Sequence, residues 1–397
     1  MIRDLSFHVV GVSHHTADLG VREQFALAPA ELDAVLAGER AAGRSALLLF
    51  TCNRCELFWS GSYDYQSWFQ DFARARGVTA ASVTRLDGVQ AVRHLFTVAA
   101  GLDSQILGET EILGQVRRAY DAARAAGTTT REMDAIFSAA LFTGRRLRRE
   151  TLLGRHPTSV SSAAVELAAN EWADGLGQRA VVVLGAGEAA EGVLGALHLH
   201  GASRVKLVSR KPERAEVLAA AWDASVHGWA ELPGLLASAD LVFVATGASR
   251  PVLSEAELSA ATAARAGRAL VTMDLSVPRN VEPTARALPG VRLYDLDDLQ
   301  RLCCPAAGAP AEALQEAERI LEEEIARLNH ALRARAAAPR LAELHRLSAQ
   351  VAEQEAAWAL SQLDDLSEQE RVVVRAMAER LVRRVLYPVS RSLRGEP

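Results

Sequence analysis

The residues best suited to chemistry stand where an apolar run ends. The run 45–50 (SALLLF) has the pattern of a buried strand, and the segment TCNR (51–54) follows it directly. A thiolate is a nucleophile, and the permanent cation of Arg54 could lower the pKa of a nearby thiol or bind a carboxylate with two hydrogen bonds. Two alternatives stay open at this point. Cys52 could be a small buried side chain that finishes a strand, and the spacing does not separate it from Cys55 as the reactive thiol.

A glycine-rich turn follows a second apolar run. Residues 180–184 (AVVVL) predict a strand, and a GxGxxA segment opens the helix after it. The first glycine of such a turn lets the chain reverse, the second lets the backbone approach a pyrophosphate, and the third small residue keeps helix and strand close. The charge of the pyrophosphate then meets the helix N-terminus. The segment therefore predicts a dinucleotide site formed by Gly185, Ala186, Gly187, Glu188, Ala189 and Ala190.

The end of the next strand distinguishes the two nicotinamide cofactors. An enzyme that uses NAD usually has an acid there, about 20 residues past the glycines, to bind the ribose hydroxyls. Here Ser209, Arg210 and Lys211 follow the strand-like run RVKLV. A hydroxyl and two cations suit a 2′-phosphate, so NADPH is expected; the alternative is that these are solvated surface charges. A thiol with a nicotinamide cofactor suggests an acyl group that becomes a thioester and is reduced to an aldehyde.

Composition excludes several other classes. The chain has 397 residues, 49% hydrophobic and 23% charged, which fits two to three globular domains. A formal net charge of −5 excludes a general polyanion binder, so any nucleic-acid contact must come from local patches. Only Lys206 and Lys211 are lysines, and neither stands in a P-loop or in a setting suited to a Schiff base. Pyridoxal enzymes and P-loop ATPases are therefore excluded.

Cysteine use and the N-terminus indicate the cell interior. Cys52 and Cys55 have the spacing of a metal knuckle, but no second CxxC or histidine pair matches it, so no metal is expected. The opening MIRDLSFHVVG does not have the pattern of a signal peptide, and no run of eighteen apolar residues occurs. We expect a cytoplasmic protein with no membrane partner.

Three patterns follow one another along the chain. Helix-like spacing at 89–153 follows the first strands, and further strand-like runs at 240–246 and 269–276 alternate with helices, which is typical of a parallel sheet. Residues 311–394 are helical throughout, with an apolar stripe that suits dimerisation. The expected α/β architecture has an N-terminal mixed α/β catalytic domain at 1–156, a Rossmann-like NADPH domain at 157–300 and an all-α dimerisation domain at 301–397.

The chain resembles the glutamyl-tRNA reductase family, whose members start the five-carbon route to 5-aminolevulinate and tetrapyrroles. The resemblance runs from about residue 8 to 300 and continues weakly to the end. It rests on these segments: GVSHHTADLGVRE (11–23), TCNRCE (51–56), HLFTVAAGLDSQILGETEILGQV (94–116), SVSSAAVELA (159–168), LGAGE (184–188), SRKPERA (209–215), DLSVPRNVEP (274–283) and YDLDDL (294–299).

The resemblance implies a role for each matching residue. Cys52 resembles the family nucleophile, which takes the glutamyl group from glutamyl-tRNA as a thioester that NADPH reduces to glutamate-1-semialdehyde. His94 resembles a histidine important for activity, although alone on an apolar helix it would be interpreted as a core residue. Residues of the glutamyl pocket would be Thr51, Asn53, Arg54, Ser104, Glu109, Thr110, Glu111 and Gln115. The resemblance also implies NADPH on Gly185 to Ala190.

Several positions depart from the family pattern. Thr110 and Glu111 replace the usual Pro and Gln, and a carboxylate at 111 would repel an anionic substrate unless it faces a cation or binds the substrate amine. The segment SHHTAD stands for the usual NHKTAP, and Tyr387 stands for a histidine near the end. Cys303 and Cys304 have no assigned role.

The resemblance also implies partners: glutamyl-tRNA(Glu), a second copy through the C-terminal helices, and a glutamate-1-semialdehyde aminomutase that takes the unstable product. Two locally basic segments are candidates for the tRNA surface. Residues 144–156 carry five arginines against one glutamate, and 371–394 carry seven against one. Two rival hypotheses are a shikimate-type NADP dehydrogenase and a non-catalytic, tRNA-binding or regulatory relative.

Overall fold

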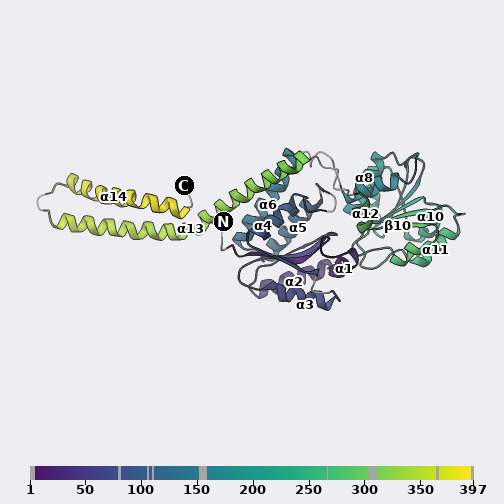
Figure 1. Cartoon of the computed structure of the whole chain (residues 1–397), viewed down its shortest axis with the longest axis horizontal. Coiled ribbons are helices and arrows are strands. Elements are labelled where there is room, and N and C mark those ends of the chain that lie inside the picture. The colour runs from purple at the N-terminus through teal and green to yellow at the C-terminus, as the bar shows by residue number, and fades with distance from the viewer. Residues whose placement is uncertain are drawn as a thin grey trace. The chain divides into compact units, whose positions relative to one another are not determined.

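A computed structural model gives the structure of the chain (Figure 1). It describes residues 5–78, 82–104, 107–109, 111–151, 159–265, 267–303, 311–363 and 366–394, and only the backbone at Pro29, Cys303, Ala311 and 392–394. The chain forms two compact units, Leu5–Leu321 and a second from Glu322 onward. Thr110 and Cys304 lie outside the described residues.

The first sheet is antiparallel, with the order β2-β3-β1-β4. Alternation along β3 sends its side chains to opposite faces. Cys55, Leu57 and Trp59 pack in a core with helices α2 and α3. Glu56 faces α4, and Phe58 faces α6. The sheet lies between these two layers of helices (Figure 1). The elements are β1 (Phe7–Ser13), α1 (Leu19–Arg22), a 3₁₀ turn (Glu23–Phe25), α2 (Pro29–Ala41), β2 (Leu47–Phe50), β3 (Arg54–Ser60), α3 (Tyr65–Ala75), β4 (Thr84–Asp87), α4 (Val89–Ala99), α5 (Glu111–Ala126) and α6 (Arg131–Glu150).

The second sheet is parallel, with the order β10-β9-β8-β5-β6-β7. Its central strands are apolar without alternation because helices cover both faces. Its elements are α7 (Val160–Ala169), β5 (Ala180–Leu184), α8 (Glu188–Leu199), β6 (Arg204–Val208), α9 (Pro212–Trp222), β7 (Ser225–His227), α10 (Leu232–Ser238), β8 (Leu241–Val244), α11 (Glu255–Ala263), β9 (Leu270–Asp274), β10 (Val291–Tyr294) and α12 (Leu296–Cys303), with 3₁₀ turns at Trp229–Glu231 and Pro283–Ala287.

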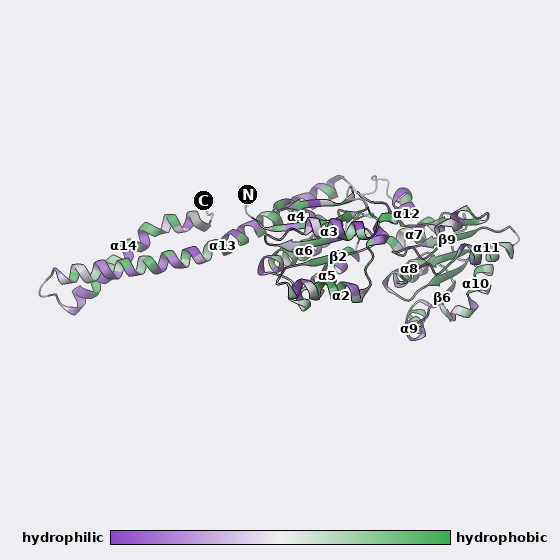
Figure 2. Cartoon of the chain, turned by 90° about the horizontal axis from the view of Figure 1, so that it is seen from below, coloured by the Kyte–Doolittle hydropathy of each residue, from purple (hydrophilic) through white to green (hydrophobic). Residues whose placement is uncertain are grey.

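Two long helices end the chain. Helix α13 (Ala311–Ser361) belongs to the first unit at its start, where Ala317 and Ile320 pack with Ala100 and Leu147. Helix α14 (Glu368–Arg394) runs back alongside the later part of α13 (Figures 1 and 2). More than half of the surface of these apolar side chains is exposed: Trp358, Val372, Val373, Met377, Leu381 and Val385. Such helices need another surface to cover them.

The structure confirms the predicted fold class and corrects two details. The stretch 311–394, expected to be helical throughout, forms two helices, of which α13 continues through Pro339. A strand, β3, begins at Arg54, and the sequence interpretation missed it although RCELFWS alternates in polarity at its start. TCNR is therefore the turn of a β2–β3 hairpin. The domain boundaries at 156 and 300 stay predictions.

Two helical glycines provide a test of the packing between α4 and α6. A Cβ on Gly144 would lie 2.5 Å from the backbone oxygen of Ala99, whereas one on Gly38 of α2 would meet nothing within 4 Å. Gly144→Ala is expected to destabilise the fold by about 1–3 kcal/mol through overpacking. Gly38→Ala is expected to stabilise it by up to about 1 kcal/mol, because alanine is the better helix former. Urea unfolding measures both, and shifts of the same sign would contradict this packing.

Candidate active site

Thr51 shapes the turn that carries Cys52. Its hydroxyl oxygen accepts hydrogen bonds from the backbone N–H groups of Asn53 at 3.1 Å and Arg54 at 3.2 Å. The N–H of Thr51 donates to the carbonyl of Arg54 at 2.9 Å, and the N–H of His14 donates to that of Asn53 at 2.8 Å. These bonds close a tight turn and attach it to the segment after β1. Cys52 stands at the tip of this turn and is half-buried.

The guanidinium of Arg54 is the centre of a buried ionic network. Arg54 is 1% exposed, and its two terminal nitrogens donate to Glu56 Oε1 at 3.0 Å and to Asp103 Oδ2 at 2.9 Å. His94 Nε2 lies 2.9 Å from the same oxygen of Glu56, and His15 Nε2 lies 2.8 Å from Asp103 Oδ1. One cation thereby joins β3, α4 and the segments after β1 and α4.

This network sets the charges of its members. Burial alone would lower the pKa of His94, but the Glu56 carboxylate outweighs it, so the pKa lies above the ordinary value. Burial would raise the pKa of Glu56 and of Asp103, yet the adjacent cations hold both below their usual range. His14 is different, since burial and then the neighbouring His15 lower its pKa to about 4. Glu56 therefore favours the charged form of His94, whereas His14 is neutral at neutral pH.

The two cysteines of the turn are now distinguishable. Cys55 is fully buried on the opposite face of β3, within the core under α2 and α3. Cys52 instead packs against the apolar core of the second sheet, as do Ala186 and Ala189 of the glycine-rich turn. Of the two thiols, only that of Cys52 lies toward the nucleotide-binding segment.

Arg54 does not activate the thiol in the manner expected from the sequence. Burial first, and then the carboxylates of Glu109 and Glu111, raise the pKa of the Cys52 thiol to about 12. The cation that opposes this shift is Arg22, because Arg54 is paired with Glu56 and Asp103. Of the two roles considered for Arg54, the structure shows the binding of carboxylates, those of Glu56 and Asp103. In the unliganded chain Cys52 is a protonated thiol that needs a base.

Glu109 is the group whose pKa best suits that role. It is 2% exposed, and burial and the nearby Glu111 raise its pKa to about 7, although a hydrogen bond with Ser104 opposes the shift. Arg148 of α6 donates to the backbone oxygen of Glu109 at 2.9 Å and fixes the segment. A carboxyl that titrates near neutral pH can both accept and return a proton.

Two more of the predicted pocket residues, Gln115 and Glu111, lie on α5. Gln115 is half-buried on α5, one turn beyond Glu111. Glu111 points toward α8, since its Oε1 lies 3.9 Å from the position of a Cβ on Gly192. Burial first and then Glu188 raise the pKa of Glu111, and the charge of Arg118 opposes this shift.

The nucleotide turn fits a dinucleotide. Gly185 has φ +119°, and a Cβ there would lie 2.2 Å from the backbone oxygen of Ala245. Gly187 is the N-cap of α8 and has open space in front of it, while Ala190 is fully buried. Glu188 pairs with Arg118 of α5 at 3.0 Å. Beyond β6, Arg210 and Lys211 are exposed and Ser209 is half-buried, and the Ser209 hydroxyl accepts from the N–H of Lys211.

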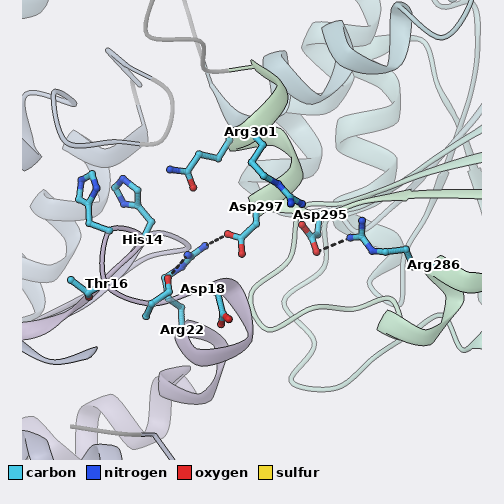
Figure 3. Close-up of a pocket in the computed structure, with 11 residues that line it drawn as sticks. His14, Thr16, Asp18, Arg22, Arg286, Asp295, Asp297 and Arg301 are labelled. Carbon is cyan, nitrogen blue, oxygen red and sulfur yellow. Dashed lines mark hydrogen bonds and ion pairs between the residues drawn. The ribbon is translucent and has the colours of Figure 1, made fainter. Parts of the chain in front are cut away.

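A cavity of about 790 Å³ lies beside the network (Figure 3). His14, His15 and Arg22 line it from the first sheet's side, and Arg286, Asp297 and Arg301 line it from the second. Its cations are paired, Arg22 with Asp297 and the other two with Asp298. The individual roles of His14, His15, Arg22, Glu56 and Asp103 were missed from the sequence, although all lie within or beside the quoted motifs.

The basic segment on α6 is largely engaged inside the protein. Arg146 and Arg149 both pair with Glu150, and Arg148 binds the Glu109 backbone. Residues 152–158 lie outside the described part. In the described residues, no three His, Cys, Asp or Glu side chains gather as a metal site would require. None of the described helices is long and apolar enough to cross a membrane.

Comparison with known proteins decides the family. A family model described as "Glutamyl-tRNAGlu reductase, N-terminal domain" matches residues 10–151, and the dimerisation domain of the same family matches 316–396. The chain is similar to "Glutamyl-tRNA reductase 2" of Anaeromyxobacter dehalogenans, with 39% identity over 98% of this chain and 88% of that one. The chain belongs to the glutamyl-tRNA reductase family. A relative from Myxococcus xanthus is 36% identical over 97% of this chain and 88% of its own length.

Two further similarities complete the comparison. A solved glutamyl-tRNA reductase from Methanopyrus kandleri is 28% identical and covers 98% of each chain with a TM-score of 0.49. A "Shikimate / quinate 5-dehydrogenase" model matches residues 166–302, between the two reductase domains. The shikimate-type domain is thus a part of this oxidoreductase, and the rival hypothesis of a separate shikimate-type enzyme is wrong. Both curated relatives are named as reductases, which favours an enzyme over the non-catalytic relative.

Removing the charge of Glu109 tests the electrostatics of the thiol. Above pH 7 the Glu109 carboxylate raises the pKa of Cys52, so Glu109→Gln is expected to lower that pKa and increase the thiolate fraction. Alkylation of Cys52 by iodoacetamide should become faster, by about tenfold for each pKa unit. The rate is measured on the Cys52 peptide by mass spectrometry, with Cys52→Ser as the background. Glu132→Gln, which removes a carboxylate bonded to Ser60, is the matched control. Equal rates in Glu109→Gln and wild type would contradict this electrostatic account.

Proposed function

We propose that the chain reduces glutamyl-tRNA(Glu) to glutamate-1-semialdehyde with NADPH, through a thioester on Cys52. The observation that carries the proposal is the position of Cys52. It stands on a turn fixed by Thr51 and packs toward the nucleotide-binding sheet. A thiol held there can receive an acyl group on one side and present it to a nicotinamide on the other.

Unpartnered polar atoms support a polar substrate at this place. Among the residues that the structure describes, four buried atoms around the turn have no hydrogen-bond partner: Asn53 Oδ1, Arg54 Nε, Glu56 Oε2 and His14 Nδ1. Buried groups of this kind are costly unless a ligand satisfies them. We assign Arg54 Nε to the side-chain carboxylate of the glutamyl group. Asn53, with Ser104 and Gln115, would orient the rest, and the carboxylates of Glu109 and Glu111 suit the ammonium of the substrate.

The acyl transfer follows from these groups. The Cys52 thiol gives its proton to Glu109, and its sulfur attacks the ester carbonyl of glutamyl-tRNA. The bond from the carbonyl carbon to the ribose oxygen breaks, and Glu109 returns the proton to that oxygen. The products are free tRNA and a glutamyl thioester. His94, whose charged form Glu56 favours, would orient the substrate.

Reduction requires a hydride from a nicotinamide cofactor. The cofactor would lie on Gly185 to Ala190, with its pyrophosphate at the open N-cap of α8 and its 2′-phosphate between Ser209, Arg210 and Lys211. NADPH supplies the hydride that converts the thioester carbonyl to the aldehyde and releases the Cys52 thiolate. In the chain, Ala186 and Ala189 place this turn on the same apolar core as Cys52.

We further propose the partners that this reaction needs. A second copy would cover the exposed apolar side chains of α13 and α14. Exposed arginines of α14, among them Arg375, Arg380, Arg383 and Arg384, suit tRNA phosphates. An aminomutase would take the reactive semialdehyde directly. The cytoplasm, where aminoacyl-tRNA is made, is the expected compartment.

Single-turnover reaction of the protein with glutamyl-tRNA tests the function. Wild type should release tRNA without cofactor and form semialdehyde when NADPH is present, and Cys52→Ser should do neither, because serine cannot form the thioester. Cys55→Ser is the control for loss of a cysteine. Semialdehyde formation by Cys52→Ser would contradict the proposal.

Arg210→Gln with Lys211→Gln should weaken NADPH binding by roughly ten- to a hundredfold while sparing NADH, because charge-assisted bonds contribute about 1.5–3 kcal/mol.

A further inference from the structure

The buried Arg22 joins three groups that belong to different parts of the site. Arg22 is 2% exposed, at the end of α1. Its Nε donates to the backbone oxygen of Cys52 at 3.2 Å, and its Nη1 donates to that of Ala17 at 2.9 Å. Its Nη2 donates to Asp297 Oδ1 of α12 at 2.9 Å. Figure 3 shows Arg22 pointing across the cavity to Asp297.

Asp297 holds α1 by a second contact. Its other oxygen, Oδ2, accepts the backbone N–H of Leu19 at 2.8 Å, the first residue of α1. The Leu19 side chain is buried in the core of the second sheet together with Leu296 and Leu299. Glu23, the next residue after Arg22, forms a two-pronged ion pair with Arg279 from the segment after β9. The start of α12 and the segment after β9 therefore fix α1, the helix whose Arg22 binds the carbonyl of Cys52.

We propose that Arg22 is a positioning residue for this reaction. Arg22 bridges the Cys52 carbonyl and Asp297 of α12. The position of the nucleophile therefore depends on how α1 packs against α12. This inference rests on the proposed function. It adds a connection between Cys52, which would carry the acyl group, and the second sheet, which would carry the cofactor. Hydride transfer needs the thioester carbon within contact distance of the nicotinamide, so loss of this docking affects reduction more than acyl transfer.

Arg22 has a second effect, which gives a readout independent of the cofactor. The charged groups that act on the Cys52 thiol are Glu109 and Glu111, which raise its pKa, and Arg22, which lowers it. Removing Arg22 removes the one favourable charge. Removing the charge of Asp297 leaves Arg22 charged and takes away its counter-ion. A role limited to stability would not separate these two variants in thiol reactivity.

The test compares Arg22→Gln, Asp297→Asn and Arg279→Gln with wild type. Cys52 alkylation across neutral and alkaline pH reports the thiol, tRNA release reports acyl transfer, and NADPH oxidation in a single turnover reports reduction. Arg22→Gln should alkylate about tenfold more slowly at a given pH. Asp297→Asn should alkylate at least as fast as wild type, release tRNA normally and reduce the thioester roughly ten- to a hundredfold more slowly. Arg279→Gln, which breaks the ion pair with Glu23, should keep the wild-type alkylation profile.

Two results would overturn the inference. One is wild-type alkylation in Arg22→Gln, and the other is a change of acyl transfer and reduction by the same factor in Asp297→Asn. If Arg22→Gln does not fold, Arg22→Lys keeps the charge without spanning both partners and should show the same split as Asp297→Asn. A wild-type protein that forms no thioester would instead contradict the proposed function, and the alkylation profiles would still test the effect of the Arg22 charge.

Discussion

The burial of one guanidinium is the constraint on which the site depends. Arg54 is removed from water inside a small domain, and this is tolerated only if carboxylates stay beside it. Glu56 and Asp103 meet that need from β3 and from the segment after α4. His94 and His15 then attach to the same two carboxylates. The turn that carries Cys52 is therefore built on a charge network, and apolar packing alone would not fix it in one position.

Burial and two carboxylates keep the thiol protonated at rest, and this network does not offset them. Burial first, and then the charges of Glu109 and Glu111, raise the pKa of Cys52, while Arg54 is already paired with two carboxylates. The site thus separates binding from activation. In the mechanism that we propose, Arg54 and His94 bind the substrate, Glu109 moves the proton, and Arg22 opposes the effect of the two acids on the thiol. A thiol that is activated only when substrate and base are in place is protected from unwanted alkylation and oxidation.

Local patterns predicted much of the fold and only part of the site. The glycine-rich turn could be assigned because Gly185, Gly187 and Ala190 have meanings set by neighbours in the sequence. The role of Arg54 could not, because its partner Asp103 is far along the chain and no spacing rule connects them. The choice between Cys52 and Cys55 required knowing that β3 begins at Arg54, which decides the face of each side chain. Glu109 was included in the pocket through the family resemblance, but its raised pKa depends on burial, which only the fold provides.

The protonation state of His94 tests the charge network most directly. NMR titration of ring-labelled histidine, assigned with a His94→Asn variant, would measure its pKa in the unliganded protein. The account predicts a pKa above the ordinary histidine value of about 6.5, because the Glu56 carboxylate lies 2.9 Å away. In Glu56→Gln the same signal should fall below that value, since burial and Arg54 would then outweigh Asp103, which raises the pKa. A pKa at or below the ordinary value in the wild-type protein would contradict the account, because the network would then not favour the charged form of His94.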